Sequence, residues 1–206
     1  MIKSAVRVGR PPQISRERIL DVARQIPARE LTMHAVARRL GVSTPALYRH
    51  FESRDELLVA LGARLSVKFA LRPPDPKNWR AWLLDTGVDF YRFLVDNPVI
   101  LSTSGWSHAA GMGEALLQAV HETLEGAGFG IVDATEIWAL VGGQVYLRAR
   151  LLHEAPAYGD PAILRSAAER LDLRSRAYVA ARGTADPNEL LVHSLRWLVS
   201  TLPDPA

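Results

Sequence analysis

The sequence predicts an all-α protein in which an N-terminal three-helix helix-turn-helix domain precedes a larger C-terminal helical domain. Apolar residues recur at helical spacing along most of the 206 residues, and we find no strand pattern of any length. Two short helical patterns flank a tight turn between Leu31 and Phe51, which is the sequence form of a helix-turn-helix. Charge divides the chain in the same way. Residues 1–70 hold 13 Lys and Arg against 6 Asp and Glu, a net charge of +7, and the remainder holds 12 against 16, a net charge of −4.

Composition indicates the cellular setting. The absence of Cys excludes disulfides and thiolate chemistry. The basic N-terminus is followed by no apolar segment, and no run of about 18 apolar residues occurs, so we expect neither a signal peptide nor a membrane span. These features predict a cytoplasmic protein that does not contact a membrane.

No pattern of catalytic or metal-binding residues is found in the sequence. The six His are dispersed without H-x-x-x-H or H-E-x-x-H spacing, and neither a Gly-rich phosphate loop nor a G-x-S-x-G turn occurs. We therefore expect a protein that is not an enzyme, has no metal site and uses no cofactor.

A proline-rich segment, Arg72–Pro76, marks the expected domain boundary, because it cannot be helical and because the charge balance changes sign there. Residues 1–13 are expected to form a flexible arm, which is either disordered or lies along a DNA minor groove. Residues 14–70 would then form the helix-turn-helix domain and residues 77–206 the C-terminal domain.

Capping residues place the first helices. Ser15 is expected to cap a helix that Pro27 ends, and Thr32 is expected to cap a second helix that runs to Leu40. Gly41 suits the left-handed position that follows such a helix.

The third helix is short, basic and aromatic. Ser43 or Thr44 is expected to cap it, and Pro45 lies in its first turn, where a missing N–H costs nothing. Leu47 and Phe51 lie four residues apart and face the core, which leaves the other side chains pointing outward.

A capping box formed by Ser53 and Glu56 starts a fourth helix. Inside a long later helix lie Gly142 and Gly143, which cost about 1 kcal/mol each relative to Ala unless close approach of another helix offsets them. The later helices are expected over residues 77–96, 99–103, 113–125, 131–153 and 187–202, with loops over 104–111 and 156–161 and a weakly helical stretch over 162–182.

The segment from Ser15 to about Leu61 resembles the DNA-binding domain of the TetR family of bacterial transcriptional regulators, and within that family the tetracycline-repressor type. The resemblance rests on LTMHAVARRLGVS for the second helix and the turn, TPALYRHF for the third helix, and ESRDELL for the start of the fourth. The rest of the chain resembles the family's regulatory domain more loosely, through the helix that begins at Trp79 and through Ala127-Gly128-Phe129 before the long helix.

The resemblance implies an all-α homodimer. The C-terminal domain would be the ligand-binding and dimerisation domain: it would form a four-helix bundle with its copy and hold a small-molecule pocket. Effector binding would respace the two recognition helices and release DNA. The implied partners are double-stranded operator DNA, a small-molecule effector and a second copy of the chain. The excess apolar surface of the long helix and of the last helix favours a helical partner independently of the resemblance.

The resemblance also implies which side chains meet DNA. Arg49 would bind either a guanine edge or a phosphate, and both interpretations stay open. Tyr48 and His50 would hold phosphate or pack as ordinary surface residues. Arg38 and Arg39, on the outer side of the second helix, are interpreted as solvated charges. The expected DNA-contacting residues are Thr32, His34, Thr44, Pro45, Ala46, Tyr48, Arg49, His50 and Arg54.

The effector site departs from the tetracycline-repressor type. The positions of that type's drug-chelating histidines carry Ala70 and approximately Ser104 here, so neither tetracycline nor magnesium is carried over. The aromatic side chains of the C-terminal domain would either line an apolar pocket or form plain helical core. The expected ligand-contacting residues are Trp82, Thr86, Phe90, Trp106, His108 and Trp138, with Phe93, His121 and Tyr146 as further candidates.

We therefore interpret the chain as a ligand-responsive DNA-binding transcriptional regulator, most simply a repressor. Two alternatives stay open. One is a helical small-molecule-binding protein without sequence-specific DNA binding, and the other is a regulator that a protein partner controls.

Overall fold

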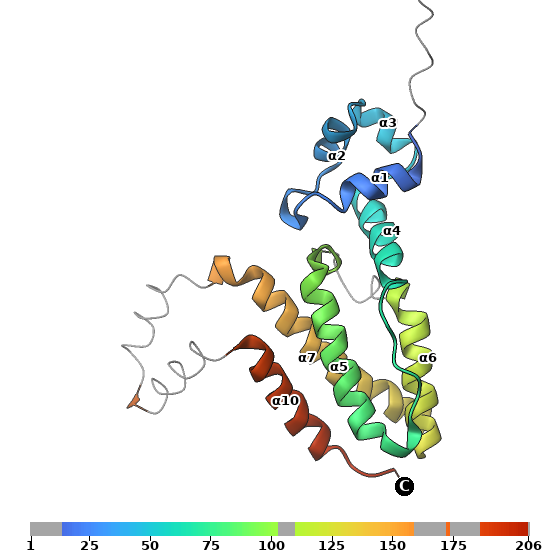
Figure 1. The fold of residues 1–206 in the computed structure, drawn as a ribbon, viewed down its shortest axis with the longest axis vertical. Coiled ribbons are helices and arrows are strands. Elements are labelled where there is room, and N and C mark those ends of the chain that lie inside the picture. The colour runs from blue at the N-terminus through green and yellow to red at the C-terminus, as the bar shows by residue number, and fades with distance from the viewer. Residues whose placement is uncertain (1–13, 103–109, 159–171, 174–185, 206) are drawn as a thin grey trace, which may run out of the picture. The chain divides into compact units, whose positions relative to one another are not determined.

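The structure is a computed structural model, which describes residues 14–102, 110–158, 172–173 and 186–205 (Figure 1). Within these ranges the chain folds into helices and contains no strand. It divides into two compact units, one that ends at Leu61 and one that begins at Gly62. Helices of the first unit are α1 (Arg16–Ala23), η1 (Ala28–Glu30), α2 (Met33–Leu40), α3 (Thr44–Tyr48) and α4 (Arg54–Ser66), the last of which continues into the second unit.

Two of the helix caps that the sequence predicts in the first unit, those at Ser15 and Thr32, are confirmed. The Ser15 hydroxyl accepts a hydrogen bond from the Arg18 N–H at 3.2 Å, and the Thr32 hydroxyl accepts one from the Ala35 N–H at 3.0 Å. Gly41 follows α2 in the left-handed conformation, with φ 70°. These three local signals fix where α1 and α2 begin and where the turn starts.

The core of the first unit takes at least one apolar side chain from each α-helix. Leu47 and Phe51 are fully buried, as their spacing predicts, and α2 packs against both α1 and α3. Their neighbours in this core, each fully or almost fully buried, are Ile19, Ala23, Leu31, Val36, Ala37, Leu57, Leu58 and Leu61.

The start of α4 differs from an ideal capping box. The Glu56 N–H donates to the Ser53 hydroxyl at 3.1 Å, as expected. The Glu56 carboxylate, however, accepts from the backbone N–H of Glu52 at 2.5 Å, one residue before the cap. Its other oxygen accepts from the Arg16 guanidinium at 2.9 Å, so the carboxylate also links the start of α4 to α1.

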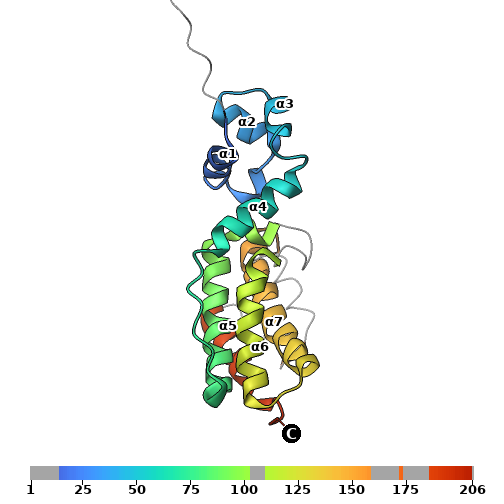
Figure 2. The same cartoon turned by 90° about the vertical axis from the view of Figure 1, so that its right-hand side faces the viewer.

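The second unit is a bundle of long helices that lie side by side (Figures 1 and 2). The core of the bundle lies where α5 packs against α7 and α10, and α6 packs against α7. The elements are η2 (Pro76–Asn78), α5 (Trp79–Asp96), η3 (Pro98–Ser102), α6 (Ala110–Ala127), α7 (Ile131–Tyr158) and α10 (Pro187–Thr201).

Glycine allows close helix packing at Gly87, a position that the sequence did not single out. A Cβ on Gly87 would lie 3.2 Å from side-chain atoms of both Leu195 and Val141, so α10 and α7 approach α5 closely here. The three atoms nearest to a Cβ on Gly142 belong to the ring of Trp138 in its own helix, the closest at 3.2 Å. Close approach of a helix from a second copy of the chain at Gly142 and Gly143 stays a prediction.

The proline-rich segment is bound to the second unit. The indole N–H of Trp82 donates to the carbonyl of Pro73 at 2.7 Å, and the N–H of Asp75 donates to the buried Thr123 hydroxyl at 3.3 Å. The Arg72 guanidinium donates to Asp89 at 2.7 Å. These contacts explain why the two compact units divide within α4, ahead of the segment in which the sequence places the boundary.

The first helix is shorter than the sequence predicts, since α1 ends at Ala23 ahead of Pro27, and two helices of the second unit are longer. The helix expected over 113–125 extends over Ala110–Ala127, and the helix expected to stop at 153 continues to Tyr158. Pro156 does not stop this helix, because it removes a single N–H near the end of a 28-residue element. The arm at 1–13, residues 104–109 of the expected loop and almost all of 162–182 lie outside the described residues.

Within the described part of the chain, no helix combines the length and hydropathy that a membrane span requires.

Gly87→Leu is expected to lower the free energy of unfolding of the second unit by about 1–3 kcal/mol, because the added atoms would force α7 and α10 away from α5. Urea unfolding followed by circular dichroism measures this. Gly62→Ala is the control, since its Cβ would meet nothing within 4 Å. Equal effects of the two substitutions would contradict the packing described for Gly87.

Candidate nucleic-acid interface

The helix α3 presents an exposed edge beyond the core of the first unit. It begins after Ser43 with Pro45 in its first turn, as predicted, and buries only Leu47. Its other residues lie at the surface. Pro45, Tyr48 and the following Arg49 are exposed, and Tyr48 is 50% exposed. Thr44, Ala46 and His50 are half-buried.

Arg49 combines exposure with an available guanidinium. It makes no ion pair with any described residue, whereas Arg16 and Arg54 of the same unit do. An arginine with five unengaged donors can bind the two acceptors of a guanine edge together, or a phosphate. The outward orientation of these side chains agrees with the sequence, and their contact with DNA stays a prediction.

The candidates outside α3 differ in how far they are already engaged. Thr32 and His34 are exposed at the start of α2, with the Thr32 hydroxyl used as a cap. Arg54 is half-buried, and its Nε donates to the carbonyl of Leu31 at 2.7 Å. Only the terminal nitrogens of Arg54 are therefore left for a phosphate, and one of them lies 3.8 Å from Asp55.

Sequence reasoning missed Arg16, which joins three elements of the first unit. Its guanidinium donates to the carbonyl of His50, forms an ion pair with Glu56 at 2.9 Å, and lies 4.0 Å from the centre of the Phe51 ring. The pKa of Glu56 is lowered, chiefly because its carboxylate accepts from the Glu52 N–H and then from Arg16. The partners of Arg16 are 34 and 40 residues away, so no local pattern could have shown this junction.

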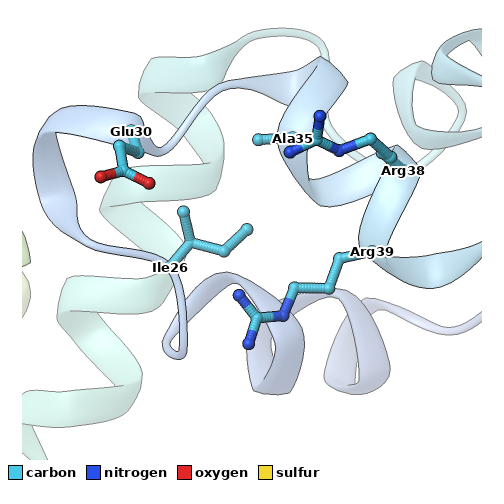
Figure 3. Close-up of a pocket in the computed structure, with 5 residues that line it drawn as sticks. All are labelled: Ile26, Glu30, Ala35, Arg38 and Arg39. Atoms are coloured by element: carbon cyan, nitrogen blue, oxygen red, sulfur yellow. The ribbon is translucent and has the colours of Figure 1, made fainter.

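Arg38 and Arg39 flank an open depression of about 480 Å³ on the outer side of α2 (Figure 3). Both are exposed and make no ion pair with a described residue, which agrees with their interpretation as solvated charges. The remaining lining residues are Ile26, Glu30 and Ala35.

Four of the six effector candidates lie in the interior of the second unit. Trp82, Thr86 and Phe90 come from α5 and Trp138 from α7, and none is more than 7% exposed. The rings of Phe90 and Trp138 lie 5.9 Å apart, and Trp82 also holds the proline-rich segment. Trp106 and His108 lie outside the described residues.

The Thr86 hydroxyl is fully buried and has no hydrogen-bond partner among the described residues. A buried hydroxyl without a hydrogen-bond partner lowers the stability of a protein by about 1–3 kcal/mol. A ligand atom that formed a hydrogen bond with Thr86 would remove this penalty. Thr86 lies one helical turn from Trp82 and from Phe90 on α5, and the buried hydroxyl of Tyr91 on the same helix also has no partner among the described residues.

Other aromatic and polar candidates make ordinary packing contacts. The sequence did not single out Phe69, whose ring lies 6.0 Å from Phe90 and 5.3 Å from Phe93. The Tyr146 hydroxyl donates to the carbonyl of Leu101 at 3.4 Å, and a ring nitrogen of His121 lies 3.2 Å from the Thr135 hydroxyl.

The fold and the exposed edge of α3 define a helix-turn-helix protein with a helical second domain. The family model for bacterial regulatory proteins of the tetR family matches residues 19–61. An HTH-type transcriptional repressor of Mycobacterium tuberculosis is 27% identical over 132 residues, which cover 61% of this chain and 51% of the relative. The class C tetracycline repressor protein of Escherichia coli is 36% identical over 78 residues, which cover 37% of this chain and 36% of the relative. The chain thus aligns with about half the length or less of these curated relatives.

Solved structures extend the similarity in fold to nearly the whole chain. TetR from Acinetobacter baumannii AYE has a TM-score of 0.66 at 18% identity and covers 91% of this chain and 95% of its own. ActR of Streptomyces coelicolor, in complex with actinorhodin, has a TM-score of 0.69 at 17% identity and covers 92% of this chain and 95% of its own. The match to the tetR family model is thus confined to residues 19–61, and the solved structures show that the chain as a whole shares the fold of these regulators.

Glu56→Gln is expected to reduce the acid sensitivity of the first unit. Because the folded-state pKa of Glu56 lies below its ordinary value of 4.5, its contribution to stability is complete above pH 4.5 and is lost as the pH falls through the lowered value. Urea unfolding midpoints measured from pH 3 to pH 7 should show a smaller loss at acid pH in this variant. Glu30→Gln, which removes an exposed carboxylate of the same unit, controls for the change in net charge. An unaltered pH dependence in Glu56→Gln would show that the junction with Arg16 is absent in solution.

Proposed function

We propose that the chain is a transcriptional regulator that binds operator DNA through α3, and that it acts as a repressor which a small molecule releases. The observation that carries the proposal is a capped helix-turn-helix whose third helix exposes Tyr48 and Arg49 beyond the core. The match of residues 19–61 to the tetR family model supports it. Gel-shift against the DNA flanking its own gene tests it, and absence of specific binding at moderate salt would count against it.

The expected DNA-contacting residues divide into those that would read bases and those that would bind phosphate. Arg49 is the proposed base-reading residue, with Pro45 and Ala46 close enough along α3 to meet a thymine methyl. The proposed phosphate contacts, which would position the unit on the duplex, are Thr32, His34, Thr44, Tyr48, His50 and Arg54.

The proposed homodimer would use α7 and α10. Leu140, Leu147 and Leu151 lie along one face of α7 and are 53%, 51% and 43% exposed, and Trp197 on α10 is 65% exposed. Two packed helices that each expose large apolar side chains are typical of an interface. A second copy of the chain would pack its own α7 and α10 against these two helices, which would give a two-fold symmetric bundle.

The proposed effector site lies in the second unit beside Thr86. The unsatisfied hydroxyl and the buried rings of Trp82, Phe90 and Trp138 in the same unit favour an aromatic molecule that carries a hydrogen-bonding group. The relative ActR was crystallised with actinorhodin and the fold is shared, which supports a small molecule as the signal. Localisation in the cytoplasm follows from the proposed role.

A second candidate function is a regulator that a protein partner controls. The burial of Trp82, Phe90 and Trp138 favours it, because these rings are packed as core. Small molecules that bind the second unit and lower operator affinity would exclude it.

Arg49→Ala is expected to lower sequence discrimination roughly tenfold or more, since a bidentate arginine–guanine pair contributes about 1–3 kcal/mol. Fluorescence anisotropy would compare a duplex that the wild-type chain enriches from a randomised library with a scrambled duplex. Arg39→Ala removes the same charge from the outer side of α2 and should weaken binding to both duplexes equally. An unchanged ratio in Arg49→Ala would restrict Arg49 to phosphate contact.

Trp197→Asp is expected to weaken self-association more than tenfold, because it would place a charge without a partner in the apolar interface. Analytical ultracentrifugation measures the dissociation constant. Val67→Asp changes a residue that is 87% exposed in another part of the chain and is expected to leave self-association unchanged. If Trp197→Asp remains dimeric, the proposed interface is wrong.

A further inference from the structure

The helix α3 lacks most of the features that fix a helix in place. It has five residues, its cap Ser43 makes no side-chain hydrogen bond, and its last turn contains no basic residue. A helix this short does not persist by itself in water. Its position must therefore come from contacts made around it.

Arg16 supplies such contacts at the C-terminal end of α3. Its Nη1 donates to the carbonyl of His50, its Nη2 donates to the Glu56 carboxylate at 2.9 Å, and its guanidinium carbon lies 4.0 Å from the centre of the Phe51 ring. The second Glu56 oxygen accepts from the Glu52 N–H at 2.5 Å. One guanidinium thus joins the first residue of α1, the end of α3 and the first turn of α4.

The geometry of this junction matters more than its strength. The side chains of Arg16 and Glu56 are 47% and 36% exposed, so solvent screens their charges and the pair is a weak source of stability. The planar fork of an arginine, however, directs two nitrogens at two acceptors in fixed relative positions. A lysine carries a single ammonium on a flexible stem, so it cannot hold the two acceptors in fixed relative positions.

We propose that Arg16 is a positioning residue for sequence readout, which fixes the direction in which α3 presents Arg49 to DNA. The His50 carbonyl that it holds belongs to the residue next to Arg49, so rotation of the end of α3 would move the Arg49 side chain directly. Hydrogen bonds to bases are lost when donors and acceptors are misaligned, whereas phosphate attraction tolerates such shifts. The inference rests on the proposed function and adds a residue that itself touches no DNA.

The test uses the full chain and the ratio of its affinities for the enriched duplex and the scrambled duplex. Arg16→Ala and Arg16→Lys are compared with Arg18→Ala, which removes a charge from an exposed residue of the same helix that makes no ion pair with a described residue. Measurements are made at a temperature where circular dichroism shows each variant folded. Should Arg16→Ala not fold, Arg16→Lys, which keeps the charge, carries the test.

We expect the ratio to fall about tenfold in both Arg16 variants, as for the loss of about one base contact. The scrambled duplex should bind Arg16→Ala and Arg18→Ala equally well, because both lose one charge. A purely structural role would lower the melting temperature and leave the ratio at the wild-type value, and that result would overturn the inference. A wild-type chain that enriches no sequence would instead contradict the proposed function and, with it, this inference.

Discussion

Burial of Leu47 and Phe51 is the interaction on which the proposed recognition surface depends. Both side chains are fully buried, and they flank the three exposed or half-buried residues Tyr48, Arg49 and His50. A helix of five residues gains little from its own hydrogen bonds, so the free energy that orders it comes from this burial. The caps on α1 and α2 and the junction at Arg16 then determine the direction in which the ordered segment faces.

The second unit meets different physical requirements. Its helices are long enough to form a core of their own, and at Gly87 the absence of a side chain lets α7 and α10 pack closely on α5. The same helices leave large apolar side chains on the surface, Trp197 and Leu140 among them. The proposed self-association would thus use faces of α7 and α10 that the core of the unit leaves exposed. The proline-rich segment adds to this unit through Trp82, and α4 continues the chain directly from one unit into the other.

Local signals could be predicted from the sequence, and contacts distant along the chain could not. The caps at Ser15 and Thr32 and the left-handed Gly41 depend on residues at most a few positions away, so pattern alone located them. The junction at Arg16 requires partners 34 and 40 residues distant, and the binding of Pro73 by Trp82 depends on how the segment folds back. Composition marked that segment as non-helical but could not show that it is bound. The effector candidates Trp82, Phe90 and Trp138 illustrate a second limit, because the same spacing is typical of a pocket wall and of a packed core.

Footprinting, which measures how far a bound protein protects DNA from cleavage, tests most directly whether this chain reads DNA sequence through α3. The purified full chain would be footprinted on the double-stranded DNA around its own gene at moderate salt. The account predicts a bounded protected window whose sequence has two-fold symmetry, because each copy of a symmetric dimer would place one α3 in the major groove. Protection that spreads evenly along the duplex, without a boundary, would show attraction to phosphate alone and would contradict the account.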